Sequence, residues 1–490
     1  MQFLLPFPLK NKFLEIGGRP AAFVLALLGC CLGAAGASAA PASRKYLLLD
    51  DRVVERVDNV RLRVGTVTKH PANPLFKEDR PWEVRFDNVY VNVTYDEATR
   101  RYQLWYSPFI VDELTTGTPV PKRPEVRYHS TPTREMGLCY ATSSDGIHWD
   151  KPALNLIDFN GSKANNLVVR CSHGGGVLRD GQEKDPARRY KLFGGQQIPG
   201  QKRQFQVAFS PDGIHWAEPL ICPEVGVDGD THNNAIWAPE LGKYVGITRR
   251  WLAGERLVMR TESTDFTRWS RAVEVMRGTG ENQTYAMPIF PYAGVYLGLV
   301  MVINTRTDLV QCELAWSPDT VLWQRIDPGH ALIPNSPTPG DYDSGCVYAG
   351  VTPVIRGDEI QLYYGASNAP HTTWRDGFLA LATLPADRFA GYVAEQAEGT
   401  ILTQPLVLAG KELLVNADAS GGEFAVEILD ANGLPIPGFS GDDRAAHAGA
   451  NGLRTPVRWK RAADLSALQG RPVRFKFRLR AAKMYSFEVR

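Results

Sequence analysis

The chain has 490 residues and a formal net charge of only +2, from 55 Lys and Arg against 53 Asp and Glu. This balance gives no electrostatic reason to expect a nucleic acid or an anionic membrane as the partner. No CxxC or paired Cys/His spacing occurs among the seven cysteines, so no metal site is predicted. The length suits two domains better than one.

Residues 1–39 are typical of a secretory signal peptide. Three positive charges precede the apolar run 21–35, namely Lys10, Lys12 and Arg19. The small residues 37–39 then form a cleavage site, so we expect a secreted or periplasmic protein. Residues 27–30 loosely match a lipobox, which leaves a lipid-anchored form as the alternative. Nothing later in the sequence is long and apolar enough to span a membrane.

A short turn motif recurs after the lead-in segment 40–79. In each copy an Asp follows one or two positions after a Ser, and a Trp follows four positions after that Asp. The four copies are Ser144–Trp149, Ser210–Trp216, Ser263–Trp269 and Ser317–Trp323. Turns led by Asp connect short strands, and a repeat of roughly 50–70 residues is typical of propeller blades.

Aromatic-rich β runs keep step with these turns. The five runs are Tyr102–Tyr106, Tyr190–Phe193, Tyr244–Ile247, Tyr296–Leu299 and Ile360–Tyr364. Together the two patterns predict an all-β protein in which residues 80–396 form a five-bladed β-propeller. From residue 397 to residue 490 the Trp turns stop and strands alternate apolar and polar residues, as in Val473–Leu479. This alternation predicts a C-terminal β-sandwich.

The innermost strand of a propeller blade lines the central channel, so polar residues at its start converge from every blade. Each predicted blade has an acid at this place. The acids are Asp87, Asp180, Asp230, Glu281 and Asp343. Carboxylates gathered in one funnel repel one another, which indicates a function rather than a contribution to stability. Two carboxylates with separated pKa values are the minimum for cleaving a glycosidic bond.

The five blades, their acids, the Asp turn, the signal peptide and the sandwich together resemble the clan of glycoside hydrolase families 32 and 43. By position Asp87 is similar to the aspartate that opens blade one in that clan. Arg179 and Asp180 are similar to its blade-two Arg-Asp pair. The chain departs from the clan in lacking a Pro after Asp180 and a Glu-Cys pair in blade three. The resemblance therefore implies a remote relative.

These patterns predict a secreted glycoside hydrolase that acts on a polysaccharide or oligosaccharide. Asp87 is expected to be the base or nucleophile and Asp180 the residue that tunes its pKa. Asp230 or Glu281 is expected to be the general acid. The predicted substrate-binding residues are Arg179, His232, Asp343, His371 and Trp237. No organic cofactor is expected, and no loop motif supports a structural calcium ion.

Two alternatives stay open. One is a carbohydrate-binding propeller without catalytic activity. The other is a different propeller enzyme that acts on carbohydrates: a lyase, a phosphorylase or a sialidase-like enzyme. The last would use arginines to grip a carboxylate, for which Arg85, Arg179 and Arg249 lie near predicted inner strands. The long insertion 108–136 is expected to be a functional loop.

Overall fold

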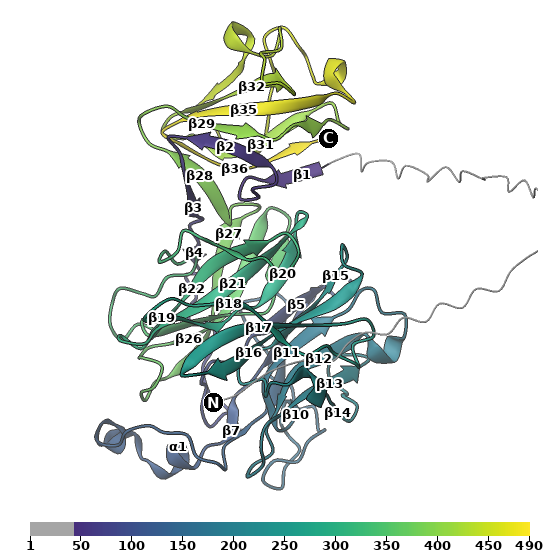
Figure 1. Cartoon of the computed structure of the whole chain (residues 1–490). Helices are drawn as coiled ribbons and strands as arrows, with labels where there is room; N and C mark the ends of the chain where they lie inside the picture. The colour runs from purple at the N-terminus through teal and green to yellow at the C-terminus, as the bar shows by residue number, and fades with distance from the viewer. Residues whose placement is uncertain (1–43) are drawn as a thin grey trace, which may run out of the picture. The chain divides into compact units, whose positions relative to one another are not determined.

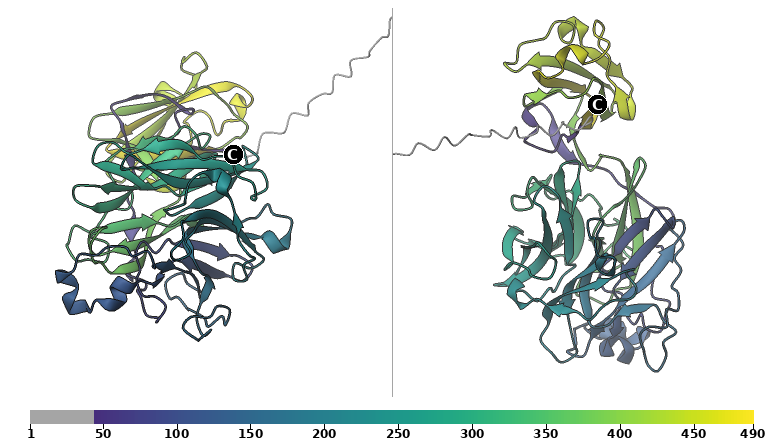
Figure 2. Two further views of the ribbon diagram at one scale, coloured as in Figure 1. Left: turned by 60° about the horizontal axis from the view of Figure 1, so that its bottom comes forward. Right: turned by 90° about the vertical axis from the view of Figure 1, so that its right-hand side faces the viewer.

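The computed structural model describes residues 44–490, which are almost entirely β-strands (Figure 1). The predicted signal peptide lies outside the described residues. The one α-helix in this range is α1 (Glu113–Gly117), and the other helical segments are short 3₁₀ turns between strands (Figure 2). Residues 44–490 include no helix long and apolar enough to cross a membrane. The prediction of an all-β protein is therefore confirmed.

Three antiparallel sheets of four strands follow one another along the chain. The first contains β5 (Asn92–Asp96), β6 (Arg101–Tyr106), β9 (Leu138–Ser143) and β10 (Leu167–Val169). The second contains β11 (Ser172–Arg179), β12 (Tyr190–Gln196), β13 (Gln204–Ser210) and β14 (Leu220–Ile221). The third contains β15 (Asn234–Ala238), β16 (Lys243–Leu252), β17 (Glu255–Ser263) and β18 (Val273–Arg277).

A ten-stranded sheet follows, in which one parallel contact between Val310 and Cys346 joins two antiparallel halves. The first half contains β19 (Asn282–Ala286), β20 (Ile289–Tyr292), β21 (Val295–Asn304), β22 (Leu309–Ser317) and β23 (Gln324–Ile326). The second contains β24 (Cys346–Ala349), β25 (Val354–Arg356), β26 (Glu359–Ser367), β27 (Gly377–Pro385) and β4 (Thr68–Lys69). Strand β4 precedes the first sheet in sequence, so the lead-in segment completes the last one.

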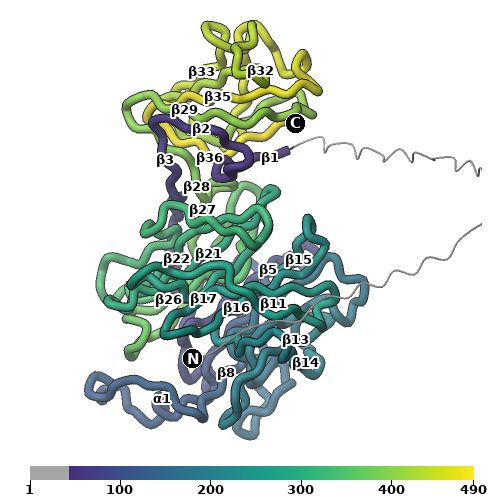
Figure 3. The backbone as a smooth tube through the Cα atoms, viewed as in Figure 1, coloured from purple at the N-terminus to yellow at the C-terminus, as the bar shows by residue number. Residues whose placement is uncertain are grey.

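Two six-stranded sheets contain the C-terminal strands and the first three strands described. One contains β3 (Arg61–Val64), β28 (Ala390–Ala394), β36 (Ala482–Val489), β31 (Leu413–Asp418), β34 (Asn451–Pro456) and β1 (Arg44–Leu47). The other contains β2 (Val54–Asp58), β29 (Gly399–Thr403), β35 (Pro472–Arg480), β32 (Glu423–Asp430), β33 (Ala445–Ala448) and β30 (Leu406–Val407). Figure 3 shows the purple strands β1 and β2 beside yellow-green strands of the C-terminal region. Both sheets contribute to one hydrophobic core.

The repeated Asp turns brace neighbouring sheets. In the second copy, Asp212 Oδ1 accepts hydrogen bonds from the backbone amides of Ile214 and His215, each at 2.8 Å. Gly213 has a φ of +78°, and a Cβ there would lie 2.4 Å from the Trp105 ring. Its carbonyl also accepts a 2.6 Å hydrogen bond from Trp105 Nε1. Glycine is therefore required where the turn of the second sheet meets the first sheet.

A buried ion pair fastens β4 to the last sheet. Lys69 Nζ lies 2.6 Å from Asp343 Oδ2, and the Asp343 side chain is 0% exposed. The same oxygen accepts a 2.9 Å hydrogen bond from Tyr364. The attraction thus holds the segment before the first sheet onto the strands that end the last one.

We predict that Lys69→Met lowers the free energy of unfolding by about 3–5 kcal/mol, because it leaves the buried charge of Asp343 without a cation to neutralise it. Equilibrium urea unfolding measures the loss. Adding Asp343→Asn to the same chain removes the uncompensated charge and should recover most of it. A single variant within about 1 kcal/mol of the parent would show that the pair does not fasten β4.

Candidate active site

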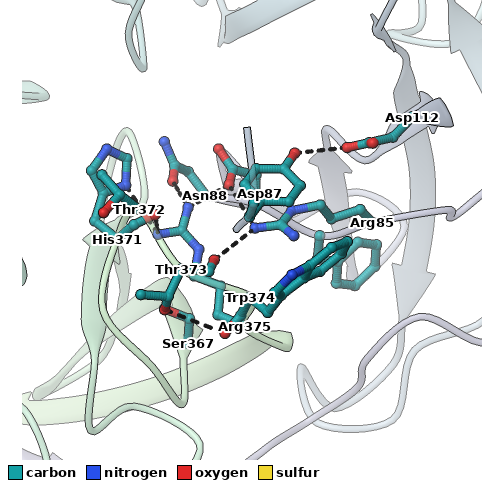
Figure 4. A network of polar contacts seen from close by, with 12 residues as sticks. Arg85, Asp87, Asn88, Asp112, Ser367, His371, Thr372, Thr373, Trp374 and Arg375 are labelled. Atoms are coloured by element: carbon teal, nitrogen blue, oxygen red, sulfur yellow. Dashed lines mark hydrogen bonds and ion pairs between the residues drawn. The ribbon is translucent and has the colours of Figure 1, made fainter. Parts of the chain in front are cut away.

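A fully buried arginine organises the surroundings of Asp87 (Figure 4). Arg375 pairs with Asp87 and donates hydrogen bonds to Asn88 Oδ1 at 3.1 Å and to the His371 carbonyl at 2.7 Å. The Asp87 side chain keeps 17% exposure. Burial alone would raise the pKa of Asp87, but Arg375 and then Arg85 hold this pKa well below its usual range. Asp87 is therefore ionised at neutral pH.

The long insertion 108–136 contacts this network, as Figure 4 shows for Asp112. The Arg85 guanidinium lies 3.6 Å from the centre of the Tyr128 ring. Tyr128 donates a 2.7 Å hydrogen bond to Asp112, and its ring packs edge-on against Trp374. The insertion thus supplies the aromatic ring of Tyr128 to the site.

The backbone just after Asp87 is strained. Val89 and Tyr90 have φ values of +61° and +48°, a region that non-glycine residues rarely adopt and that is least favourable for a β-branched valine. Such conformations cost about 1–3 kcal/mol each and cluster at functional sites. Here they place Asn88 Nδ2 to donate to Tyr90 Oη at 3.1 Å and to Tyr285 Oη at 2.9 Å. Within residues 44–490 neither phenol donates its own proton to an acceptor.

Four side chains surround the second carboxylate of the site, Asp230, which is 29% exposed. Arg249 Nη2 and Arg203 Nη1 lie 2.9 and 2.8 Å from its two oxygens. His173 Nε2 is 3.1 Å away, and Trp251 Nε1 donates at 3.3 Å. Burial would raise the pKa of Asp230, but Arg249 and His173 lower it well below its usual range. This aspartate is ionised as well.

Two tyrosines join the networks of the two aspartates. The Tyr285 ring centre lies 4.9 Å from the Arg249 guanidinium and 4.9 Å from the centre of the His371 ring. The Tyr90 ring lies 5.9 Å from that of His173. Burial raises the pKa of both phenols, so both keep their protons. The two carboxylates therefore belong to one cluster with two protonated phenols between them.

Two histidines predicted as substrate-binding residues lie in this cluster and are neutral. Burial lowers the pKa of His232 to about 3, and its ring packs 5.2 Å from that of Tyr90. Burial and the charge of Arg375 lower the pKa of His371 to about 3. His371 Nδ1 lies 3.0 Å from Arg375 Nη1. A neutral ring nitrogen can accept that bond, which an imidazolium could not.

The structure places Asp180 outside the cluster. Strand β11 begins at the cluster, where His173 pairs with the second aspartate, and Asp180 follows its other end. Seven residues of extended strand separate them by roughly 20 Å. Asp180 instead pairs with the buried Lys191 at 2.9 Å and accepts a 2.6 Å hydrogen bond from Tyr244. Arg179 lies at the same distant end, 38% exposed.

Three more of the predicted residues also make their contacts elsewhere. Trp237 packs edge-on against Tyr244, at the Asp180 end of the sheets. Glu281 is exposed and pairs with Arg306 at 3.0 Å. Asp343 forms the buried ion pair that fastens β4. The acids at the starts of the predicted inner strands therefore do not all converge.

Sequence reasoning missed several members of the cluster, including Arg375, Asn88, His173 and Tyr285. A signal was present for Arg249, which lies within the apolar strand β16, because charged residues in such strands are rarely buried without a partner. Arg375 lies in the loop before β27, where no such signal exists. Arg249 was considered only for the sialidase-like alternative. Within residues 44–490 no three or more His, Cys, Asp or Glu side chains are grouped to hold a metal ion.

No protein-family model matches the chain, and no curated protein matches it. Its fold is similar to solved structures of glycoside hydrolase-like propeller proteins. One is an N-acetylgalactosamine deacetylase from F. plautii in complex with blood group B trisaccharide. It is 13% identical with a TM-score of 0.43, over 68% of this chain and 97% of that one.

A second structure comes from work on the GH130 family of mannoside phosphorylases. That family contains glycoside hydrolases that target β-1,2-mannosidic linkages in Candida mannan. It is 15% identical with a TM-score of 0.43, over 65% of this chain and 94% of that one. A third, a glycosyl hydrolase from Bacteroides ovatus, is 13% identical with a TM-score of 0.42, over 65% of this chain and 94% of that one. At this distance the chemistry has to be derived from the chain's own residues.

The two neutral histidines predict a pH dependence of stability. An unfolded histidine has a pKa near 6.5, whereas His232 and His371 have pKa values of about 3 when folded. The unfolded chain therefore binds more protons below pH 6.5, and each histidine removes about 2 kcal/mol of stability by pH 5. His232→Gln should make this decline shallower in urea unfolding at pH 7 to 5. The exposed His129→Gln should leave the slope unchanged, and equal slopes for both variants would contradict the prediction.

Proposed function

We propose that the protein is an exported carbohydrate-active enzyme, a glycoside hydrolase whose catalytic domain is a five-bladed β-propeller followed by a β-sandwich. Three four-stranded sheets and the two halves of the ten-stranded sheet support five blades. The two six-stranded sheets that share one core support the sandwich. The lead-in segment then contributes to both, because β4 completes the last blade and β1 to β3 belong to the sandwich sheets.

The observation that carries the proposal is the pair of partly exposed, ionised carboxylates in one buried polar cluster. An ionised Asp87 can take a proton from an attacking water or attack the anomeric carbon itself. An ionised Asp230 can stabilise the positive charge that develops on the sugar ring in the transition state. Asn88 and the guanidinium groups supply donors for sugar hydroxyls.

The proton for the leaving oxygen has to come from another group, because arginines keep both aspartates ionised. Tyr90 and Tyr285 keep their protons and donate them to no acceptor in the described part of the chain. We assign to one of these phenols the hydrogen bond to the leaving oxygen. This assignment of a phenol replaces the sequence-based expectation that Asp230 or Glu281 is the general acid. It also gives no role to Asp180, which was expected to adjust the pKa of Asp87.

A polysaccharide lyase is the second candidate, and the neutral histidines beside arginines favour it. In β-elimination a base removes the proton next to a sugar carboxylate while cations neutralise that carboxylate. The bond to the leaving oxygen breaks, this oxygen takes a proton from an acid, and a carbon–carbon double bond forms. His173, whose pKa is lowered by burial and by Arg203, is a candidate base, and a phenol is a candidate acid.

We predict that Asp87→Asn and Asp230→Asn each reduce glycan cleavage at least about 100-fold, because each removes a charge that touches the reacting sugar. Reducing-end release from a panel of glycans measures cleavage by either reaction, and ultraviolet absorbance of unsaturated products measures elimination alone. Glu281→Gln is the matched control and should keep full activity, since its side chain lies on the surface.

The outcomes separate the candidates. Release of reducing ends without ultraviolet absorbance supports the hydrolase. Release of reducing ends together with ultraviolet absorbance supports the lyase, because elimination leaves a free hemiacetal as well as an unsaturated sugar. Glycan binding that is equal in the parent and in Asp87→Asn, with no product from any glycan, would favour a binding protein instead. Full activity in Asp87→Asn would remove the proposed site altogether.

A further inference from the structure

A groove of about 460 Å³ opens beside Asp230, between the second and third sheets. Its lining includes Arg203 and Phe205 from the second sheet and Arg250 and Trp251 from the end of β16. Two of these residues also contact the catalytic cluster, since Arg203 pairs with Asp230 and Trp251 donates to it. We call this space the Trp251 groove. It is continuous with the proposed site through these shared side chains.

The charge of the Trp251 groove is mostly positive. Its lining contains Lys202, Arg203 and Arg250 against a single acid, Asp228. Among residues 44–490 neither Lys202 nor Arg250 has an ion-pair partner. Both side chains are exposed, so they are free to pair with a ligand. An oxyanion would gain charge-assisted hydrogen bonds from them that a neutral ligand would not.

Trp251 adds an aromatic surface to these charges. Its side chain is 44% exposed, which is unusual for so large an apolar group. The Arg256 guanidinium lies 4.1 Å from its ring centre and supports the ring from one side. Flat, partly apolar sugar faces pack well against such rings. The groove therefore combines a stacking surface for a sugar with cations for a negatively charged substituent.

We propose that the Trp251 groove binds an acidic sugar unit of the substrate, one that carries a carboxylate or a sulfate group, next to Asp230. The sugar ring stacks on Trp251, and Arg250 and Lys202 pair with the oxyanion. Arg250 can do so through two parallel hydrogen bonds, because the guanidinium fork matches the spacing of carboxylate oxygens. This inference names the substrate class of the proposed enzyme and so rests on its acting on carbohydrates.

Isothermal titration calorimetry on the mature protein tests the inference without needing turnover. The probes are an oligogalacturonate, an alginate oligosaccharide, and a chondroitin oligosaccharide in sulfated and unsulfated form. The methyl ester of the oligogalacturonate is the matched neutral ligand, because it keeps the sugar and removes the charge. Inorganic phosphate alone tests whether a free anion is the true ligand.

We predict that at least one acidic glycan binds and that its neutral counterpart binds at least about tenfold more weakly. Arg250→Gln should weaken acidic binding about tenfold or more, since it removes a charge-assisted hydrogen bond to the oxyanion. Arg277→Gln is the control: it removes an exposed arginine of the same sheet that does not line the groove, and binding should not change.

The inference fails if no acidic glycan binds, if the methyl ester binds equally well, or if Arg250→Gln matches Arg277→Gln. It also fails if phosphate binds and no glycan does. Cleavage of a neutral glycan without acidic binding would overturn the groove and leave the proposed function standing. Acidic binding without any product would leave the groove standing and overturn the enzymatic proposal.

Discussion

The geometry of the site depends on the buried ion pair between Arg375 and Asp87. Arg375 lies just before β27 of the ten-stranded sheet, and Asp87 lies before β5 of the first four-stranded sheet. The same guanidinium donates to Asn88, to the carbonyl of His371 and to Tyr348. Burying the Arg375 guanidinium without these partners would cost several kcal/mol. The folded chain therefore keeps the segment of Asp87 beside the segment of Arg375. One interaction thus joins distant parts of the chain and fixes Asp87, the first carboxylate of the candidate site.

Positive charge in turn decides which chemistry the site can perform. Arginines keep both Asp87 and Asp230 ionised, so neither is a proton donor at neutral pH. Burial has the opposite effect on the phenols of Tyr90 and Tyr285, which keep their protons. Bases and proton donors are therefore separated by their surroundings rather than by residue type. The excess of cations beyond these two carboxylates is also what makes an acidic substrate the best fit to the adjoining groove.

The sheets that carry the site are braced from outside it. Each Asp turn fixes a tight loop by its own hydrogen bonds, and in the second copy Gly213 lets the loop approach Trp105 of the preceding sheet. Lys69 and Asp343 bind β4 to the last sheet from the other end of the sequence. Strained residues such as Val89 can persist at the site because this surrounding framework over-determines their conformation.

The sequence by itself determined the all-β class, the repeated turns and the strands, because turn chemistry and alternation act over a few neighbouring residues. It also picked out Asp87 and Asp230, which lie at the ends of strands that meet. It could not distinguish them from Asp180, since a strand's pattern does not say which of its ends faces the site. Only the tertiary structure decided that, and only it brought Arg375 to Asp87 and Tyr285 to Asn88. These contacts join residues 288 and 197 positions apart in the sequence. Their energy depends on burial and on partners brought together by the fold, which the pattern of neighbouring residues cannot predict.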